Sequence, residues 1–327
     1  MAHTVPGSSN GSDVTITDAD ILAARGAKAD VDPFVPYAFL VEPEHAASGR
    51  VEDVATLFLT NRECPFRCLM CDLWQHTTDA PVPVGAIPAQ IDHALDRLPA
   101  AQHVKLYNSG NFFDRKAVPI ADHHAIAERV RGFETVIVEN HPKLCGPAVA
   151  RFRDLIAPAR LEVALGLETI HPEVMPRLNK RMTLADYERA VRYLRTHDID
   201  VRTFILLRPP WLSEAEGVAW AVKSVAYAFE VGVQCAAVVP VRGGNGMMER
   251  LADSGDFNPP SLASMEVVLE AGLAMRRGRV FMDLWDAEQF TTCAACAVTR
   301  IERMHRMNLT QQIEAAVPCP TCGHGLS

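Results

Sequence analysis

Short apolar runs alternate with amphipathic segments from residue 55 onward, and this alternation is the strongest constraint on the fold. The runs are rich in β-branched residues and nearly continuous in apolar character, which is typical of parallel strands buried on both faces. The predicted strands span 55–60, 103–107, 135–139, 161–167, 201–207, 235–239 and 280–284. The predicted helices between them span 88–98, 121–131, 147–156, 184–196, 214–231 and 262–276.

Six successive strand–helix units predict right-handed crossovers and one parallel sheet, and therefore an α/β protein. Such a sheet either closes into a full or partial barrel or lies open as a doubly wound sheet. In both architectures ligands bind at the carboxyl ends of the strands. The residues that follow each predicted strand are therefore the candidates for a functional site.

The regions outside this pattern suggest three parts. Residues 1–50 form an N-terminal extension whose first 16 residues, rich in Gly, Ser, Thr, Asn and Asp, are expected to be disordered or loosely attached, followed by a short helix near 18–26. Residues 51–287 form the barrel. Residues 288–327 lose the alternation and are predicted to be a small cysteine-rich appendage.

The composition narrows the function classes. With 32 Lys and Arg against 40 Asp and Glu, the formal charge is −8, which argues against a surface that coats polyanions. We find no uninterrupted apolar run long enough for a membrane-spanning helix and no signal-peptide pattern, so we expect a cytoplasmic protein without a membrane partner. In that reducing compartment, clustered cysteines are read as metal ligands rather than disulfides.

The sharpest motif is Cys64-Pro-Phe-Arg-Cys68-Leu-Met-Cys71, in the loop after the first predicted strand of the barrel. Three thiolates from one short loop can hold three irons of a [4Fe–4S] cluster and leave the fourth iron open for a substrate or cofactor. Two alternatives are a zinc site with His76 as fourth ligand and a set of buried structural cysteines.

This CxxxCxxC loop resembles that of the radical S-adenosylmethionine (SAM) superfamily, over roughly residues 54–285. The resemblance implies a partial (β/α)6 TIM-like barrel of radical SAM type, with Cys64, Cys68 and Cys71 as catalytic cluster ligands. It also implies that SAM binds the open iron and that one electron, from a donor such as flavodoxin or ferredoxin, cleaves SAM. The resulting 5′-deoxyadenosyl radical abstracts hydrogen from the substrate.

The same resemblance assigns cofactor contacts at other strand ends. Asn108-Ser109-Gly110 occupies the place of a glycine-containing SAM motif, and Glu168 follows the fourth strand. Lys180 is expected to meet the SAM carboxylate, with Arg181 as the alternate, while Arg208 places a cation at the barrel mouth. The expected SAM-contacting residues are Met70, Asn108, Ser109, Gly110, Glu168, Lys180, Arg181 and Arg208.

A second cysteine set lies near the C-terminus, where Cys293-Ala-Ala-Cys296 and Cys319-Pro-Thr-Cys322 form two CxxC pairs. Two such pairs predict a tetrahedral zinc site of four thiolates. A second [4Fe–4S] cluster with four cysteine ligands is the main alternative, and an unmetallated set is the third.

Within the superfamily, the residues at the strand ends look most like the Elongator-catalytic-subunit-like branch, and there the radical SAM subunits of archaeosine synthases, which modify tRNA. Three functional interpretations follow. The first is a radical SAM lyase or transferase acting on a small molecule or a modified tRNA nucleoside, although the acidic charge does not support tRNA. The second is a sulfur-inserting or methylthiolating radical SAM enzyme with an auxiliary cluster. The third is a non-catalytic zinc or iron–sulfur interaction protein.

Overall fold

The computed structural model describes residues 16–325, so the expected N-terminal tail lies almost entirely outside the described part of the chain. The first element is helix α1 (Asp18–Ala24), which confirms the predicted short helix. It begins at a capping box, because the Thr17 hydroxyl accepts from the amide of Asp20 while the Asp20 carboxylate accepts from the amide of Thr17.

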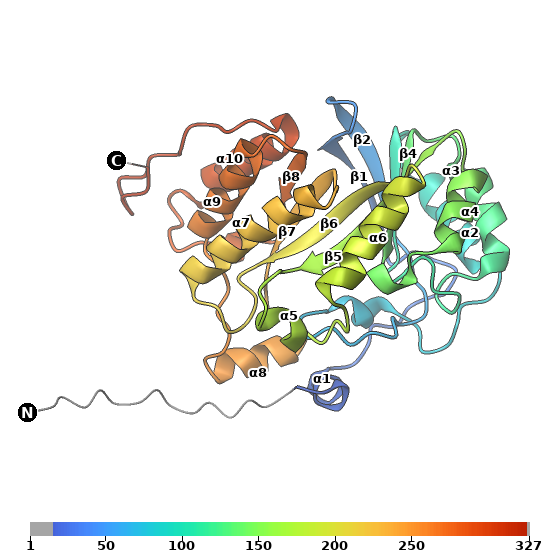
Figure 1. The fold of residues 1–327 in the computed structure, drawn as a ribbon, viewed down its shortest axis with the longest axis horizontal. Coiled ribbons are helices and arrows are strands. Elements are labelled where there is room, and N and C mark those ends of the chain that lie inside the picture. The colour runs from blue at the N-terminus through green and yellow to red at the C-terminus, as the bar shows by residue number, and fades with distance from the viewer. Residues whose placement is uncertain (1–15, 326–327) are drawn as a thin grey trace, which may run out of the picture.

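Eight strands form one curled sheet in the order β1 to β8, so every strand pairs only with its neighbours in the chain (Figure 1). Strand β1 is antiparallel to β2, and the seven strands from β2 to β8 are mutually parallel. The strands are β1 (Ala38–His45), β2 (Val51–Phe58), β3 (His103–Tyr107), β4 (Thr135–Asn140), β5 (Arg160–Glu168), β6 (Asp200–Leu207), β7 (Cys235–Pro240) and β8 (Arg279–Met282).

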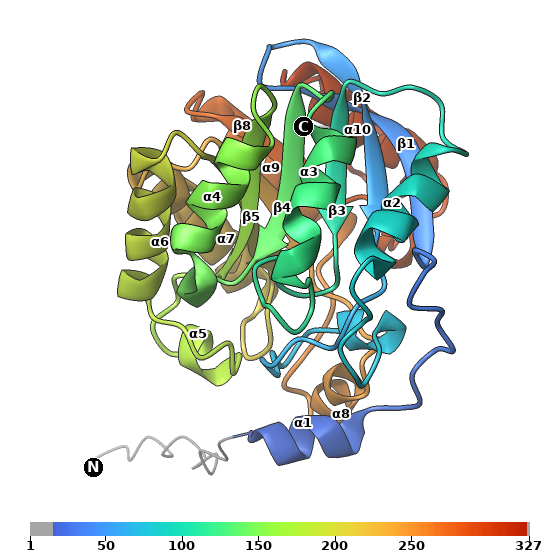
Figure 2. The same ribbon diagram turned by 90° about the vertical axis from the view of Figure 1, so that its right-hand side faces the viewer.

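Helices cover the outer face of this sheet, as Figure 2 shows for α2, α3, α4 and α6. The main hydrophobic core lies between these helices and the sheet. The helices are α2 (Ala86–Leu95), α3 (His123–Val130), α4 (Pro147–Leu155), α5 (Val174–Arg177), α6 (Leu184–Thr196), α7 (Glu214–Glu230), α8 (Met247–Asp253), α9 (Leu262–Ala274) and α10 (Ala297–Thr310). Short 3₁₀ helices are η1 (Leu73–His76), η2 (Ile120–Asp122), η3 (Pro142–Leu144) and η4 (Ala287–Phe290). Within residues 16–325, none of these helices combines the length and the apolar character that crossing a bilayer requires.

The predicted α/β half-barrel is confirmed, and all seven predicted strands are present. Two predicted helices begin where the sequence places their caps. Thr183 caps α6 with Asp186, and Ser213 caps α7 with Glu216. The prediction missed β1, which joins β2 through a tight turn at Gly49. Strand β2 pairs with β1 and therefore begins at Val51, before the predicted start at residue 55.

The interior of the half-barrel contains an ionic layer near the amino ends of the parallel strands. Arg202 lies at its centre and binds the carboxylates of Glu162 and Glu44, the first of these 2.6 Å from its Nε. Lys105 donates to Glu44 at 2.6 Å, and Arg279 donates to Glu162 at 2.6 Å. Burial alone would raise the pKa of Glu162, but Arg202 and Arg279 outweigh it and lower that pKa to about 2. The charges compensate one another and fill this end of the barrel.

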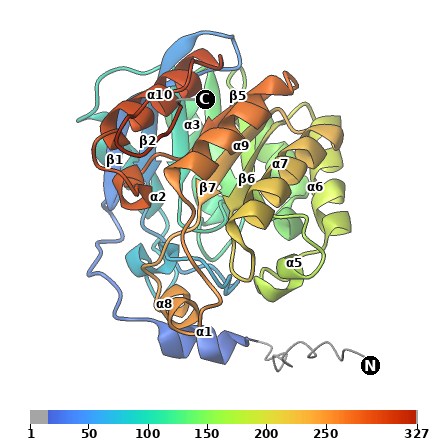
Figure 3. The same ribbon diagram turned by 90° about the vertical axis from the view of Figure 1, so that its left-hand side faces the viewer.

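Helix α10 covers the open side of the half-barrel, where it contacts both edge strands, β1 and β8 (Figure 3). Two side-chain amides, one in α10 and one at its C-cap, bond the backbone of β8 as a neighbouring strand would. Asn308 bonds the backbone amide and carbonyl of Met282 at 3.0 and 2.8 Å, and Gln311 bonds those of Val280 at 2.7 and 2.9 Å. Because an unpaired strand edge leaves backbone groups unsatisfied, these two amides complete the sheet.

We predict that replacing Asn308 with Leu destabilises the protein, because the amide and carbonyl of Met282 then lose their partners in a half-buried setting. The expected loss is about 1–3 kcal/mol in the free energy of unfolding, measured with urea. The matched control is Gln312→Leu, since Gln312 is exposed and its replacement should cost no more than about 0.5 kcal/mol. Equal losses in the two variants would contradict the role of Asn308.

Candidate functional site

The three clustered cysteines lie in the loop between β2 and η1, at the carboxyl ends of the parallel strands. All three thiols are half-buried, and burial raises the pKa of each, that of Cys68 to about 12. The thiols are therefore neutral at pH 7 in the metal-free chain. A metal that binds here must displace their protons, so metal binding to Cys64, Cys68 and Cys71 is expected to weaken at low pH.

Amide side chains from distant parts of the chain hold the backbone of this loop. Asn245, just before α8, donates to the carbonyls of Leu69 and Cys71 at 2.8 and 3.3 Å. Asn179, after α5, donates to the carbonyl of Arg67 at 2.7 Å. These two side chains hold three carbonyls of the loop, so the barrel itself sets the shape of the cysteine loop.

The arrangement of the three thiols fits a cluster better than a single ion. Among the described residues, the ligand atoms of Cys64, Cys68 and Cys71 do not converge within 4.8 Å of one another, with or without His76. His76 instead stacks on Tyr37, with ring centroids 4.6 Å apart. In a cube of four irons each thiolate binds a different iron, and so its ligands lie further apart than those of one ion. This geometry disfavours the alternative of zinc with His76.

Gly110 and Asn111, in the loop after β3, pack directly on Cys64. A Cβ on Gly110 would lie 3.3 Å from the Cβ of Cys64, which is tighter than ordinary van der Waals contact. Asn111 donates to the Cys64 sulfur at 3.1 Å. The loop after β3 therefore touches the cysteine loop.

Asn108 and Ser109 are both buried beside this contact. The Asn108 amide donates to Asn61 at 3.2 Å, while its own side-chain oxygen has no partner among the described residues. The Ser109 hydroxyl lies 2.9 Å from that of Tyr37. A buried amide oxygen without a donor is rare, and it is a place where a ligand N–H or O–H group would bind.

Glu168 and Lys180 form a buried ion pair at the end of β5. Burial alone would lower the pKa of Lys180, but the Glu168 carboxylate beside it outweighs this effect, so that pKa is raised. The pair lies over Gly166, where any Cβ would collide with both side chains. The pairing of β5 with β6 also shifts register between Gly166 and Glu168, as at a β-bulge. The structure thus brings two predicted cofactor residues together beside the cysteines.

The other residues predicted to contact SAM are Met70, Arg181 and Arg208. Met70 packs at the edge of a small hydrophobic cluster that includes Leu69 and Ile21. Arg181 pairs with Asp18 of α1. Arg208 donates to the carbonyl of Pro259 at 2.7 Å and to Glu214. Among the described contacts, none brings Arg181 or Arg208 to the cysteines.

Three residues at the site escaped the sequence analysis because nothing local marks them. Asn179 and Asn245 anchor the cysteine loop, and Asn111 bonds a sulfur. His141 supports the loop differently, since its ring stacks on Phe66 with centroids 3.8 Å apart and its Nε2 lies 3.0 Å from the carbonyl oxygen of Lys180.

Helix α1 lies against α8 at the same end of the barrel (Figure 2). Its Ile21 is buried in the cluster around Leu69, and Asp18 accepts from Asn179 at 2.8 Å. Gly246 packs so closely on the carbonyl of Ala24 that a Cβ would collide with it. Segments before residue 50 therefore cover part of the cysteine loop.

Glu139 is a second acid of the site, half-buried at the end of β4. Burial raises its pKa to about 8, against the opposing effects of the Gly110 amide and of Lys180. Across the lumen, Arg242 donates to Asp283 at 2.6 Å. Both acids lie at the carboxyl ends of their strands, where barrels of this kind bind substrate.

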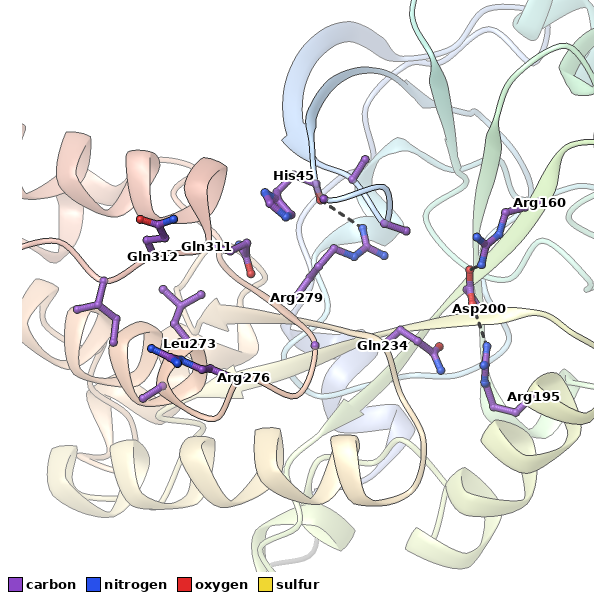
Figure 4. Close-up of a pocket in the computed structure, with 16 residues that line it drawn as sticks. His45, Arg160, Arg195, Asp200, Gln234, Leu273, Arg276, Arg279, Gln311 and Gln312 are labelled. Carbon is purple, nitrogen blue, oxygen red and sulfur yellow. Dashed lines mark hydrogen bonds and ion pairs between the residues drawn. The ribbon is translucent and has the colours of Figure 1, made fainter.

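A pocket of about 1300 Å³ lies at the opposite end of the barrel (Figure 4). Residues at the amino ends of the parallel strands line it, among them Arg160, Asp200 and Arg279. Asp200 binds Arg195 at 2.8 Å and also binds Arg160, so its charge is compensated. In barrels of this kind the active site lies at the carboxyl ends of the strands, and we therefore place the functional site at the cysteine loop.

These features define an α/β half-barrel with a loop of three cysteines at the carboxyl ends of its strands. Residues 59–214 match the family model "Radical SAM superfamily". This part of the chain is therefore a radical SAM domain, and the resemblance drawn from the cysteine motif is confirmed.

Several proteins are similar to about two thirds of the chain or more. An uncharacterised protein of Methanocaldococcus jannaschii is 22% identical over 284 residues, covering 79% of this chain and 76% of that protein. The archaeosine synthase subunit beta of Thermococcus kodakarensis is 26% identical over 231 residues, covering 66% of this chain and 69% of the relative. Among solved structures, the archaeal Elp3 of Methanocaldococcus infernus is 14% identical, with a TM-score of 0.48, over 68% of this chain and 59% of that one.

We predict that Gly166→Ala displaces the Glu168–Lys180 pair, because the added methyl group occupies the space of both charged ends. The expected loss is about 1–3 kcal/mol of unfolding free energy. Gly132→Ala is the matched control, since nothing lies within 4 Å of a Cβ there and its φ is not positive. Unfolding curves of the two variants that coincide with the wild type would show that the pair does not depend on Gly166.

We also predict that Glu139 makes stability fall as pH rises. Its pKa is about 8 in the folded chain against an ordinary 4.5, so between these values the folded state binds a proton that the unfolded state has released. Glu139→Gln removes this dependence. The stability of the variant relative to the wild type should grow by on the order of 1 kcal/mol per pH unit between about pH 5 and 8.

The measurement is urea unfolding of the metal-free proteins across this pH range. Glu128→Gln is the control, because Glu128 is exposed on α3 and should leave the profile unchanged. A Glu139→Gln profile parallel to that of the wild type would mean that Glu139 ionises normally.

Proposed function

We propose that this protein is a radical SAM enzyme whose [4Fe–4S] cluster is held by Cys64, Cys68 and Cys71. The observation that carries the proposal is the loop at the carboxyl ends of the strands, in which three half-buried thiols are not gathered as closely as one ion requires and lie beside the Glu168–Lys180 pair. When bound, the cluster and SAM supply the 5′-deoxyadenosyl radical that abstracts hydrogen from the substrate. The chain supplies ligands, orientation and exclusion of water.

The residues next to the cysteines suit the two charged ends of the methionine part of SAM. Lys180 is a buried cation whose pKa is raised, and it would bind the carboxylate. Glu168 is a buried acid beside it and would accept from the ammonium or the ribose. The unpartnered Asn108 oxygen is a further acceptor on the same side. In a site shielded from water, such fixed charges orient a ligand more effectively than they would in solvent.

The lumen suits a polar substrate that enters from the cysteine end. The ionic layer around Arg202 fills the opposite end. Above it, Glu139 and the Arg242–Asp283 pair offer hydrogen-bonding groups next to the half-buried rings of Tyr107 and Phe204. This lining supports a substrate with both an aromatic or ring surface and hydrogen-bond donors, such as a small molecule or a modified nucleoside.

The similarity to an archaeosine synthase subunit supports a tRNA nucleoside as substrate and a second subunit as partner. The formal charge of −8 gives this chain little attraction for RNA phosphates. We therefore propose that a partner protein supplies most of the RNA contacts, while this chain supplies the radical chemistry. The electron would come from a donor such as flavodoxin or ferredoxin.

The test is 5′-deoxyadenosine formation from SAM by anaerobically reconstituted, dithionite-reduced protein. We predict that Cys68→Ser abolishes product formation, because the cluster loses a thiolate ligand. Cys145→Ser is the matched control, since Cys145 is also half-buried but lies in the 3₁₀ region after β4, and it should retain most of the activity. Product from Cys68→Ser at the wild-type rate would refute the proposed cluster ligands.

A further inference from the structure

The four C-terminal cysteines form a compact group that is separate from the radical SAM site. Cys293 and Cys296 precede α10, and Cys319 and Cys322 follow it. The sulfur of Cys293 lies 4.0 Å from that of Cys319, and the sulfur of Cys296 lies 3.8 Å from that of Cys322. All four sulfurs lie within 4.8 Å of one another.

These separations match a single tetrahedral ion. With zinc–sulfur bonds of about 2.3 Å, the thiolates of a tetrahedral site are about 3.8 Å apart. A [4Fe–4S] cluster requires its four thiolates to spread over four irons, so its ligand sulfurs lie further apart than the 3.8 and 4.0 Å found here. The close spacing of the four sulfurs therefore favours one ion over a cluster.

The surroundings of the group suit a site with excess negative charge. Cys293, Cys296 and Cys319 are buried together, and four thiolates around one divalent ion leave a net charge of −2. The guanidinium of Arg300 lies 4.0 Å from the Cys296 sulfur. Arg300 and Arg303 are both buried and pair with Glu266, and Arg303 also pairs with Glu270. Arg300 is therefore the cation placed to offset the charge of the thiolates.

The group also ties together the two ends of the segment that completes the barrel. Cys296 immediately precedes α10, and the last residues of that helix carry the Asn308 cap on β8. After the helix the chain returns alongside it, where Arg303 donates to the carbonyl of Ala315 at 2.8 Å and Arg306 pairs with Glu314. The return brings Cys319 back to Cys293. An ion at this point therefore fixes α10 against the edge strands.

We propose that Cys293, Cys296, Cys319 and Cys322 bind one zinc ion, and that this ion braces α10 over the open side of the half-barrel. The site is closed by four thiolates, so it leaves no position for SAM. It also holds no bridging sulfide, and the sulfur-insertion alternative therefore has no sulfur source at these cysteines. The inference does not depend on the proposed function, because it rests on a separate set of residues.

The first test is metal analysis of a Cys64→Ala, Cys68→Ala, Cys71→Ala variant purified and reconstituted anaerobically with iron and sulfide. The expected result is one zinc per chain and no iron–sulfur absorption. Iron with acid-labile sulfide in this variant would overturn the proposal and restore an auxiliary cluster at the C-terminus. Mononuclear iron, or disulfides between the four cysteines in place of metal, would overturn it as well.

The second test concerns the brace and uses hydrogen exchange on the full chain. Removing zinc with a chelator, or by Cys319→Ser with Cys322→Ser, should speed exchange of the amides of Val280 and Met282 by on the order of tenfold. These are the β8 amides that Gln311 and Asn308 hold. Amides of β5 serve as the internal reference, and Cys145→Ser as the variant control. Unchanged exchange of the β8 amides after zinc loss would refute the brace. If the double variant does not fold, the chelator experiment on the wild-type chain still provides the test.

Discussion

The hydrogen bonds from Asn245 and Asn179 to the cysteine loop are the interactions on which the site depends. A loop that carries three half-buried thiols gains little from its own contacts, and its carbonyls need partners. Those partners come from the ends of β7 and α5, more than a hundred residues further along the chain. The cysteines therefore reach their geometry only once the barrel has formed, which preorganises them before any metal binds.

The half-barrel separates structural and chemical tasks between its two ends. At the amino ends of the strands, Arg202 and its partners fill the lumen with compensated charge. At the carboxyl ends, acids and amides remain with raised pKa or without partners, as Glu139 and Asn108 illustrate. An acid with a raised pKa or a buried amide without a partner does not stabilise the fold. Such groups are therefore the ones expected to contact a ligand.

The sequence allowed the seven parallel strands, the capped helices and the cysteine loop to be predicted, because periodicity and cap residues act locally. Strand β1 was missed because it carries Glu42, Pro43 and Glu44, which read as a polar, broken segment. The buried cation Arg202 of β6 pairs with Glu44, and this long-range contact places the acidic segment in the sheet. The roles of Asn179 and Asn245 also depend on long-range contacts, so no local pattern could mark them. The three-part division of the chain and the individual SAM contacts stay predictions.

The central claim is that the three thiols of the loop hold a cluster with one open iron that SAM occupies. Electron paramagnetic resonance of the dithionite-reduced, reconstituted protein tests it most directly, recorded with and without SAM. We predict a [4Fe–4S]⁺ signal whose shape changes when SAM is added, because a new ligand on one iron alters the electronic structure. A signal that is identical with and without SAM, or no iron–sulfur signal in fully reconstituted protein, would contradict the account.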